Sequence, residues 1–167
     1  MRTLALAAAA ALSLAPAAFA SPLPSVSSVS VAIGPELQEK AEKTYGVRDV
    51  QRLADELQRE AEQALARSGA LGGGGRLELV LVDAKPNRPT FKQLGDTPGL
   101  SFQSFGVGGA TIEGRAISAD GAVTPISYRW YETDIRQAAY GSTWSDAEWT
   151  IERFAGRLGR GQALAQR

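Results

Sequence analysis

Seven apolar residues between positions 50 and 65 recur with the spacing of one face of an α-helix. They are Val50, Leu53, Ala54, Leu57, Ala61, Ala64 and Leu65. Such a stripe predicts an amphipathic helix that buries one face against another layer of the fold. We expect this helix to begin after Asp49, a good N-cap residue, and to end at Ser68-Gly69.

The segments on either side of this helix carry strand and turn patterns. In the N-terminal half we expect a strand at residues 29–33, a helix from Pro35 to Gly46, the helix described above, a flexible link at 71–75 and a strand at 77–82. In the C-terminal half we expect a long connection at 85–99, strands at 110–118 and 123–132 around an Asp-Gly turn, and a helix from Ser145 to Gly159. Residues 101–105 are either a further short strand or part of the long connection. Ser145 and Glu148 have the spacing of a capping box.

The order of these elements is β-α-α-β-β-β-α, which predicts an α+β fold. We expect one mixed or mostly antiparallel sheet of about four strands, covered by helices. The domain spans residues 26–159, preceded by a Pro/Ser tether at 21–25 and followed by a flexible tail at 160–167. This length allows one hydrophobic core without a disulfide or a metal.

The first twenty residues have the features of a secretory signal peptide. Arg2 precedes an apolar run, and Ala18-Phe19-Ala20 has the small-x-small pattern of a cleavage site. Cleavage after Ala20 predicts a periplasmic or secreted protein without a stable membrane anchor. The alternative is an uncleaved anchor helix, for which the run is short.

The composition excludes several kinds of chemistry. The chain has no Cys and no His, so thiolate nucleophiles, Ser-His-Asp triads and His- or Cys-based metal sites are absent. Basic and acidic residues balance at 18 each, which argues against nucleic acid as a partner. We therefore expect no metal and no cofactor, and we assign no catalytic residue.

Carboxylates are the acid–base groups that remain. Glu132 and Asp134 lie together after the second hairpin strand. A pair of carboxylates with one pKa raised by burial is typical of glycosidases. These residues carry the alternative hypothesis, a small hydrolase that acts on an envelope polymer.

The best binding candidates lie on the long connection and on the second hairpin strand. The connection contains Asn87, Arg88, Phe91 and Lys92. Pro86 and Pro89 stiffen it, so it is a rigid, basic segment with one aromatic ring. Its alternative reading is a rigid crossover that packs Phe91 on the sheet. On the strand, Ile126, Tyr128 and Trp130 alternate as core residues, which leaves Arg129 and Tyr131 as exposed candidates. A second alternative joins these aromatic residues with Trp144 and Trp149 in a platform for sugars or peptides.

The predicted element order is strand–helix–strand–meander–helix, in a chain that we expect to be exported. An aromatic strand follows a hairpin with the sequence Glu113-Gly114-Arg115-Ala116-Ile117-Ser118-Ala119-Asp120-Gly121. In this element order, residues 26–158 resemble small uncharacterised envelope proteins of proteobacteria. They also resemble the α+β modules of envelope-assembly proteins, such as the N-terminal domain of the Tol-Pal translocation protein. The resemblance implies an envelope role and transfers no site residue.

We therefore expect a non-enzymatic envelope binding or accessory protein whose partner is a protein or a glycan. The hydrolase is the rival, and a purely structural or inhibitor-like domain is a third possibility. The sequence does not specify an oligomeric state.

Overall fold

The computed structural model describes residues 24–139 and 141–162. The predicted signal peptide, residues 21–23 of the tether and residues 163–167 of the tail lie outside this range. Within it, no helix is both long enough and apolar enough to cross a membrane.

The fold is α+β, with one open mixed sheet of four strands and helices packed against it. The elements in chain order are β1 (Val26–Ile33), α1 (Pro35–Lys40), a π-helical turn η1 (Ala41–Tyr45), α2 (Val47–Ser68), β2 (Leu71–Lys85), α3 (Phe91–Asp96), β3 (Gly109–Ile117), β4 (Val123–Tyr131), α4 (Ile135–Ala138) and α5 (Ser145–Gly159). The strands follow the order β1-β2-β3-β4, with β1 parallel to β2 and the other pairs antiparallel. The predicted fold class is confirmed.

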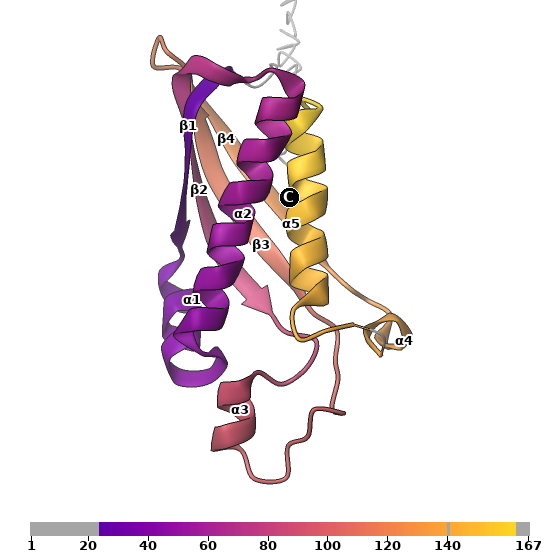
Figure 1. Cartoon of the computed structure of the whole chain (residues 1–167). Coiled ribbons are helices and arrows are strands. Elements are labelled where there is room, and N and C mark those ends of the chain that lie inside the picture. Colours follow the sequence, from indigo (N-terminus) through magenta and orange to yellow (C-terminus); the bar gives the residue numbers. More distant parts are fainter. Residues whose placement is uncertain (1–23, 140, 163–167) are drawn as a thin grey trace, which may run out of the picture.

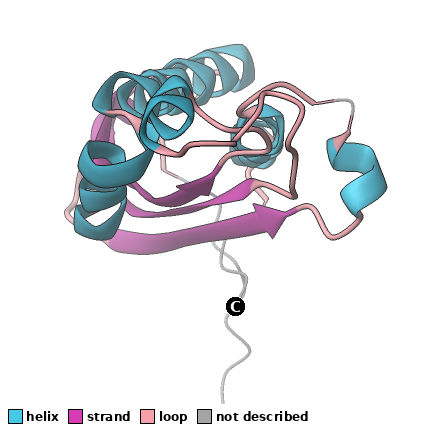
Figure 2. Cartoon of the chain, turned by 90° about the horizontal axis from the view of Figure 1, so that it is seen from below, coloured by secondary structure: helices cyan, strands magenta, loops and turns pink. Residues whose placement is uncertain are grey.

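The long helices α2 and α5 lie side by side on one face of the sheet, so the domain has two layers (Figures 1 and 2). The apolar stripe of α2 is buried in full, from Val50 to Leu65. It meets Leu77, Leu79 and Leu81 of β2 in the main core. The ring of Phe154 on α5 lies 6.1 Å from that of Tyr128 on β4. Among the described elements, no helix covers the opposite face of the sheet (Figure 2).

The predicted flexible link at 71–75 is wrong, because these residues form the start of β2. Their glycines permit close backbone approach between strands rather than flexibility. A Cβ on Gly73 would lie 2.3 Å from the Cβ of Ser25, and a Cβ on Gly75 would lie 2.4 Å from the carbonyl oxygen of Ile117. Side chains at these positions would collide with the neighbouring chain.

The structure corrects the predicted capping of two helices, although α5 begins at Ser145 as predicted. Helix α2 begins at Val47, so Asp49 lies in its first turn rather than at the N-cap. Helix α5 has Trp144 at its N-cap, and no capping box forms with Glu148. The carboxylate of Glu148 instead accepts a hydrogen bond from Arg52 of α2, at 2.9 Å. The predicted helix ends agree, and Gly69 closes α2 in the left-handed conformation.

The long connection after β2 contains a short helix, α3, that the sequence reading left out. Thr90 caps it, and a capping box with Gln93 closes its first turn. Residues 101–105 form no strand. Phe91 is 79% exposed, so the alternative interpretation, in which its ring packs on the sheet, is wrong.

Candidate functional site

Asn87 fixes the connection after β2 to the start of α5. Its side chain is buried, and its amide donates to the carboxylate of Asp146 and to the carbonyl of Gly106. Its side-chain oxygen accepts from the backbone N–H of Asp146 at 2.9 Å. The same Asp146 carboxylate accepts from the backbone N–H of Gly108 at 2.8 Å. Both polar atoms of the Asn87 side chain are therefore engaged within the protein, and Asn87 serves as a structural pin.

Arg88 ties this connection to the segment between α4 and α5. Its guanidinium donates to three carbonyl oxygens, those of Gly141 at 2.7 Å, Ala139 at 2.7 Å and Phe102 at 3.0 Å. It also lies 5.8 Å from the centre of the Phe105 ring. A planar fork of donors suits this arrangement, because one side chain satisfies carbonyls from several loop segments.

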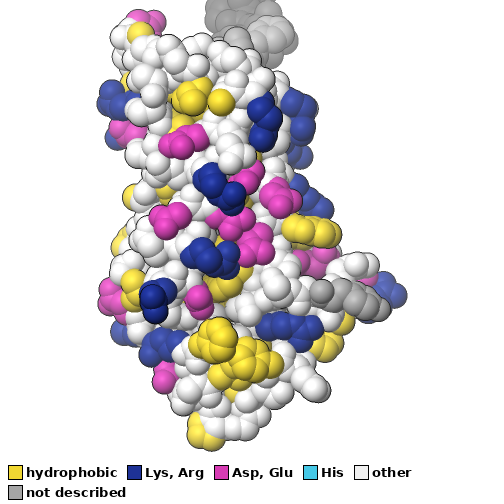
Figure 3. Space-filling view, in the orientation of Figure 1, with side chains coloured by type: hydrophobic (Ala, Val, Ile, Leu, Met, Phe, Trp, Pro, Cys, Tyr) yellow, Lys and Arg dark blue, Asp and Glu magenta, His cyan; other side chains and the backbone are white. Residues whose placement is uncertain are grey.

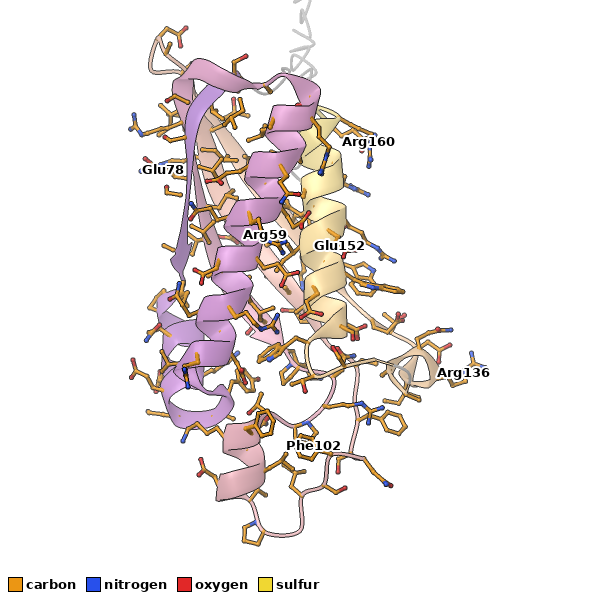
Figure 4. All side chains as sticks on the ribbon, viewed as in Figure 1. Arg59, Glu78, Phe102, Arg136, Glu152 and Arg160 are labelled. Carbon is orange, nitrogen blue, oxygen red and sulfur yellow. The ribbon has the colours of Figure 1, made fainter. Side chains whose placement is uncertain are left out.

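Phe91, Phe102 and Phe105 are exposed at this end of the domain, and we call these three residues the aromatic tip. Their exposed fractions are 79%, 52% and 47%. The rings of Phe91 and Phe102 meet edge to face, with centroids 5.5 Å apart. Figure 3 shows hydrophobic side chains gathered at this end, and Figure 4 places Phe102 on the loop beside α3. Of the three residues, only Phe91 is among the binding candidates that the sequence predicts.

Lys92, the fourth candidate on this connection, forms an ion pair with Asp96 at 2.8 Å. The two residues are one helical turn apart on α3 and partly exposed. Lys92 therefore belongs to the polar rim of the aromatic tip, where its charge is already partnered.

Tyr131 and Arg129 lie on the sheet face that the described helices leave uncovered. A register shift between Leu81 and Asp83 places Asp83 opposite Thr111, which in turn faces Arg129. The Tyr131 hydroxyl donates to the Asp83 carboxylate at 2.6 Å, and the Arg129 guanidinium lies 5.1 Å from the centre of the Tyr131 ring.

This polar cluster links α1 to β2 and β4, because Lys40 at the end of α1 also donates to Asp83, at 2.7 Å. Burial opposes the ionisation of Asp83, but the hydrogen bonds from Lys40 and Tyr131 prevail and lower its pKa. Burial, together with the hydrogen bond to Asp83, raises the pKa of Tyr131 to about 12. A phenol that stays protonated at neutral pH serves here as a hydrogen-bond donor between β4 and β2.

The structure separates the predicted site residues into two groups. Asn87 and Arg88 line a small cavity of about 170 Å³ together with Phe105. Tyr131 and Arg129 lie beyond it, on the sheet face. Phe102 and Phe105 were missed because the sequence reading treated their segment only as a strand or a loop. Their signal was the repeated aromatic residue in Phe102-Gln103-Ser104-Phe105.

The two carboxylates of the hydrolase hypothesis take part in local structure. Glu132 accepts from the backbone N–H groups of Thr133 and Asp134, at 2.8 and 2.9 Å. Asp134 caps α4 and forms a two-pronged pair with Arg136, and this pairing lowers the pKa of Asp134. A general acid needs the opposite shift.

Within residues 24–139 and 141–162, no three acidic side chains gather in a way that would hold a metal ion. No protein-family model matches the chain, and a search of curated proteins gives no significant match.

Proposed function

We propose that this protein is a non-enzymatic binding protein of the bacterial cell envelope that contacts a partner protein through its aromatic tip. The observation that carries the proposal is the exposure of three phenylalanine rings on one end of the domain, at 79%, 52% and 47%. Clustered apolar rings in water are costly, and such clusters commonly mark interaction sites.

The chemistry of the tip favours a protein over a glycan. Phe91, Phe102 and Phe105 carry no hydrogen-bonding group, whereas sugars require polar contacts around an aromatic face. Polar side chains lie beside the rings: Arg88 is 5.8 Å from the centre of the Phe105 ring, and Lys92 pairs with Asp96 on α3, the helix that begins at Phe91. An aromatic centre with a polar rim is the usual anatomy of a protein–protein interface.

The tip is held in place before any partner binds. Arg88 donates to the carbonyl of Phe102, and the Thr90–Gln93 capping box fixes the start of α3 next to Phe91. Asn87 anchors the base of the connection to Asp146. Because these contacts already order the connection, binding requires little further loss of conformational entropy.

An envelope location is the second part of the proposal. It rests on the signal-peptide features of residues 1–20 and on the absence of Cys, which suits an oxidising compartment. The rival hydrolase has weaker support, since Arg136 lowers the pKa of Asp134 and Glu132 binds two backbone N–H groups.

The test is site-specific photo-crosslinking in cells that export the full chain. A photoreactive phenylalanine at position 102 should yield one discrete crosslinked protein. The same probe at Val123, at the start of β4 and at the other end of the domain from the aromatic tip, should yield none. The captured protein is then purified and its affinity is measured for the wild type and for Phe91→Ala/Phe102→Ala. We expect that double variant to bind at least about tenfold more weakly.

The matched control is Leu71→Ala/Val123→Ala, which removes exposed apolar side chains far from the tip. It should bind like the wild type. Equal affinity of the tip variant and the wild type would overturn the proposal. So would crosslinking of position 102 to lipid or glycan alone.

A further inference from the structure

A second surface feature lies between the edge strand β4 and helix α5, away from the aromatic tip. It is a groove of about 550 Å³ lined by Tyr128, Trp130, Glu152, Arg153, Arg157 and Arg160. Tyr128 belongs to the buried core, as the sequence predicts, and Trp130 packs against that core while remaining partly exposed.

Three arginines form a row along the helical wall of this groove. Arg153, Arg157 and Arg160 are spaced i, i+4 and i+7, so their α-carbons span about 10 Å along the helix axis. Among the residues that the structure describes, none of the three has a carboxylate within 4.0 Å, although Glu152 lines the same groove. Figure 3 shows basic side chains along the upper part of α5, where Figure 4 labels Arg160.

Aromatic rings hold two of these arginines in place. The Arg153 guanidinium lies 4.3 Å from the centre of the Trp130 ring and 5.6 Å from that of Trp149. The Arg157 guanidinium lies 5.3 Å from the centre of the Tyr128 ring. Contact with a ring uses the flat face of a guanidinium and leaves its in-plane N–H groups available for an oxyanion.

The third arginine lies against the helix itself. The Arg160 guanidinium folds back to within 3.4 Å of the position that a Cβ on Gly156 would occupy, which is an ordinary van der Waals distance. Both residues line the groove, so Arg160 continues the arginine row.

We infer that this groove binds an acidic polysaccharide, with carboxylate groups of successive sugars on the arginine row and a sugar face on Trp149, which lies beside Arg153 at the groove. A row of arginines about 10 Å long suits repeated negative charges better than a single anion. Trp149 is 52% exposed, so its ring is available for an apolar sugar face. A carbohydrate is favoured over a nucleic acid because the signal-peptide features predict export.

The test measures binding of polygalacturonate to the full-length exported protein, by calorimetry and by tryptophan fluorescence, since Trp130 and Trp149 both contact Arg153. We expect binding that weakens as salt rises. Arg153→Ala/Arg157→Ala should reduce the affinity at least about tenfold. Arg153→Lys/Arg157→Lys keeps the charge, loses the planar fork and should give an intermediate affinity.

The charge-matched control is Lys43→Ala/Arg48→Ala, which removes two exposed cations at the junction of η1 and α2. It should bind polygalacturonate as the wild type does, and neutral dextran should bind to none of the proteins.

Absence of binding, or equal binding by the arginine variant and the wild type, would overturn the inference. Tighter binding of single-stranded DNA or of anionic lipid vesicles would overturn it as well. Variants of the aromatic tip should leave this binding unchanged, so the two proposals fail or stand separately.

Discussion

Asn87 and Asp146 are joined by two hydrogen bonds of opposite direction, although 59 residues separate them in the sequence. The Asn87 amide donates to the Asp146 carboxylate, and the Asn87 side-chain oxygen accepts from the Asp146 backbone N–H at 2.9 Å. Both side chains are buried, at 2% and 7% exposure. Through this pair, the connection that carries the aromatic tip is fixed to the first turn of α5.

Replacing Asn87 with Ala should lower the free energy of unfolding by about 2–3 kcal/mol, because Asp146 would keep a buried carboxylate with fewer donors. Urea denaturation of the variant and the wild type measures this difference. Gln103→Ala, at an exposed position on the same connection, is the control and should stay within about 0.5 kcal/mol. A loss no larger than that of the control would contradict the role of Asn87 as a pin.

Arg88→Lys should destabilise the domain by about 1–2 kcal/mol, because one ammonium cannot donate in the plane to three separate carbonyls. Phe91→Ala should change stability little, since that ring is 79% exposed. Thermal unfolding of both variants separates the two roles on one connection. The reverse order of stabilities would show that Arg88 does not hold the connection in place.

The sequence predicted best those elements whose burial follows a local repeat. The apolar stripe from Val50 to Leu65 predicts one buried helix face, and every residue of the stripe is buried in the structure. The hairpin turn at Asp120-Gly121 was equally predictable from the sequence, because its stabilising hydrogen bond is local. The Asp120 carboxylate accepts from the backbone N–H of Ala122, only two residues away. In both cases the partners that determine the structure are near in sequence.

Features that depend on distant partners were not predictable in this way. The sequence around Gly73 and Gly75 suggests a flexible link, whereas in the structure Ser25 and Ile117 pack against these glycines. The sequence suggests that Arg88 is a free cation, whereas in the structure it donates to the carbonyls of Ala139 and Gly141, more than fifty residues later in the chain. A local sequence pattern cannot predict such contacts, because the partner residues are far away in the sequence.

The close packing at the start of β2 gives a prediction of its own. Gly75→Ala should destabilise the domain by about 1–3 kcal/mol, because the added Cβ would lie 2.4 Å from the Ile117 carbonyl and 2.9 Å from that of Ser25. Gly95→Ala is the matched control, since a Cβ there meets nothing within 4 Å and the residue lies in α3. Denaturation curves should show a loss for the first variant and none for the second. Equal stabilities would indicate that residues 71–75 are the flexible link that the sequence suggested.

Stability at high pH should depend on Tyr131. Its pKa is raised from 10.0 to about 12 by burial and by the hydrogen bond to Asp83. A group whose pKa is higher in the folded state stabilises the fold fully below its unfolded pKa, and this contribution disappears as pH rises through the folded value. The free energy of unfolding should therefore decrease between about pH 10 and 12 as the phenol ionises.

Tyr131→Phe removes this ionisable group and should make the decrease shallower, while costing about 1 kcal/mol at neutral pH through the lost hydrogen bond. The pKa of Lys40 is also raised, by its hydrogen bond to Asp83, and burial raises that of Tyr45. Both groups therefore add to the decrease, and Tyr45→Phe, which retains Tyr131 and Lys40, is the control. Urea denaturation at steps from pH 9 to 12 measures each profile. If Tyr131→Phe and the wild type lose stability with the same slope, the Tyr131–Asp83 hydrogen bond does not link β4 to β2 energetically.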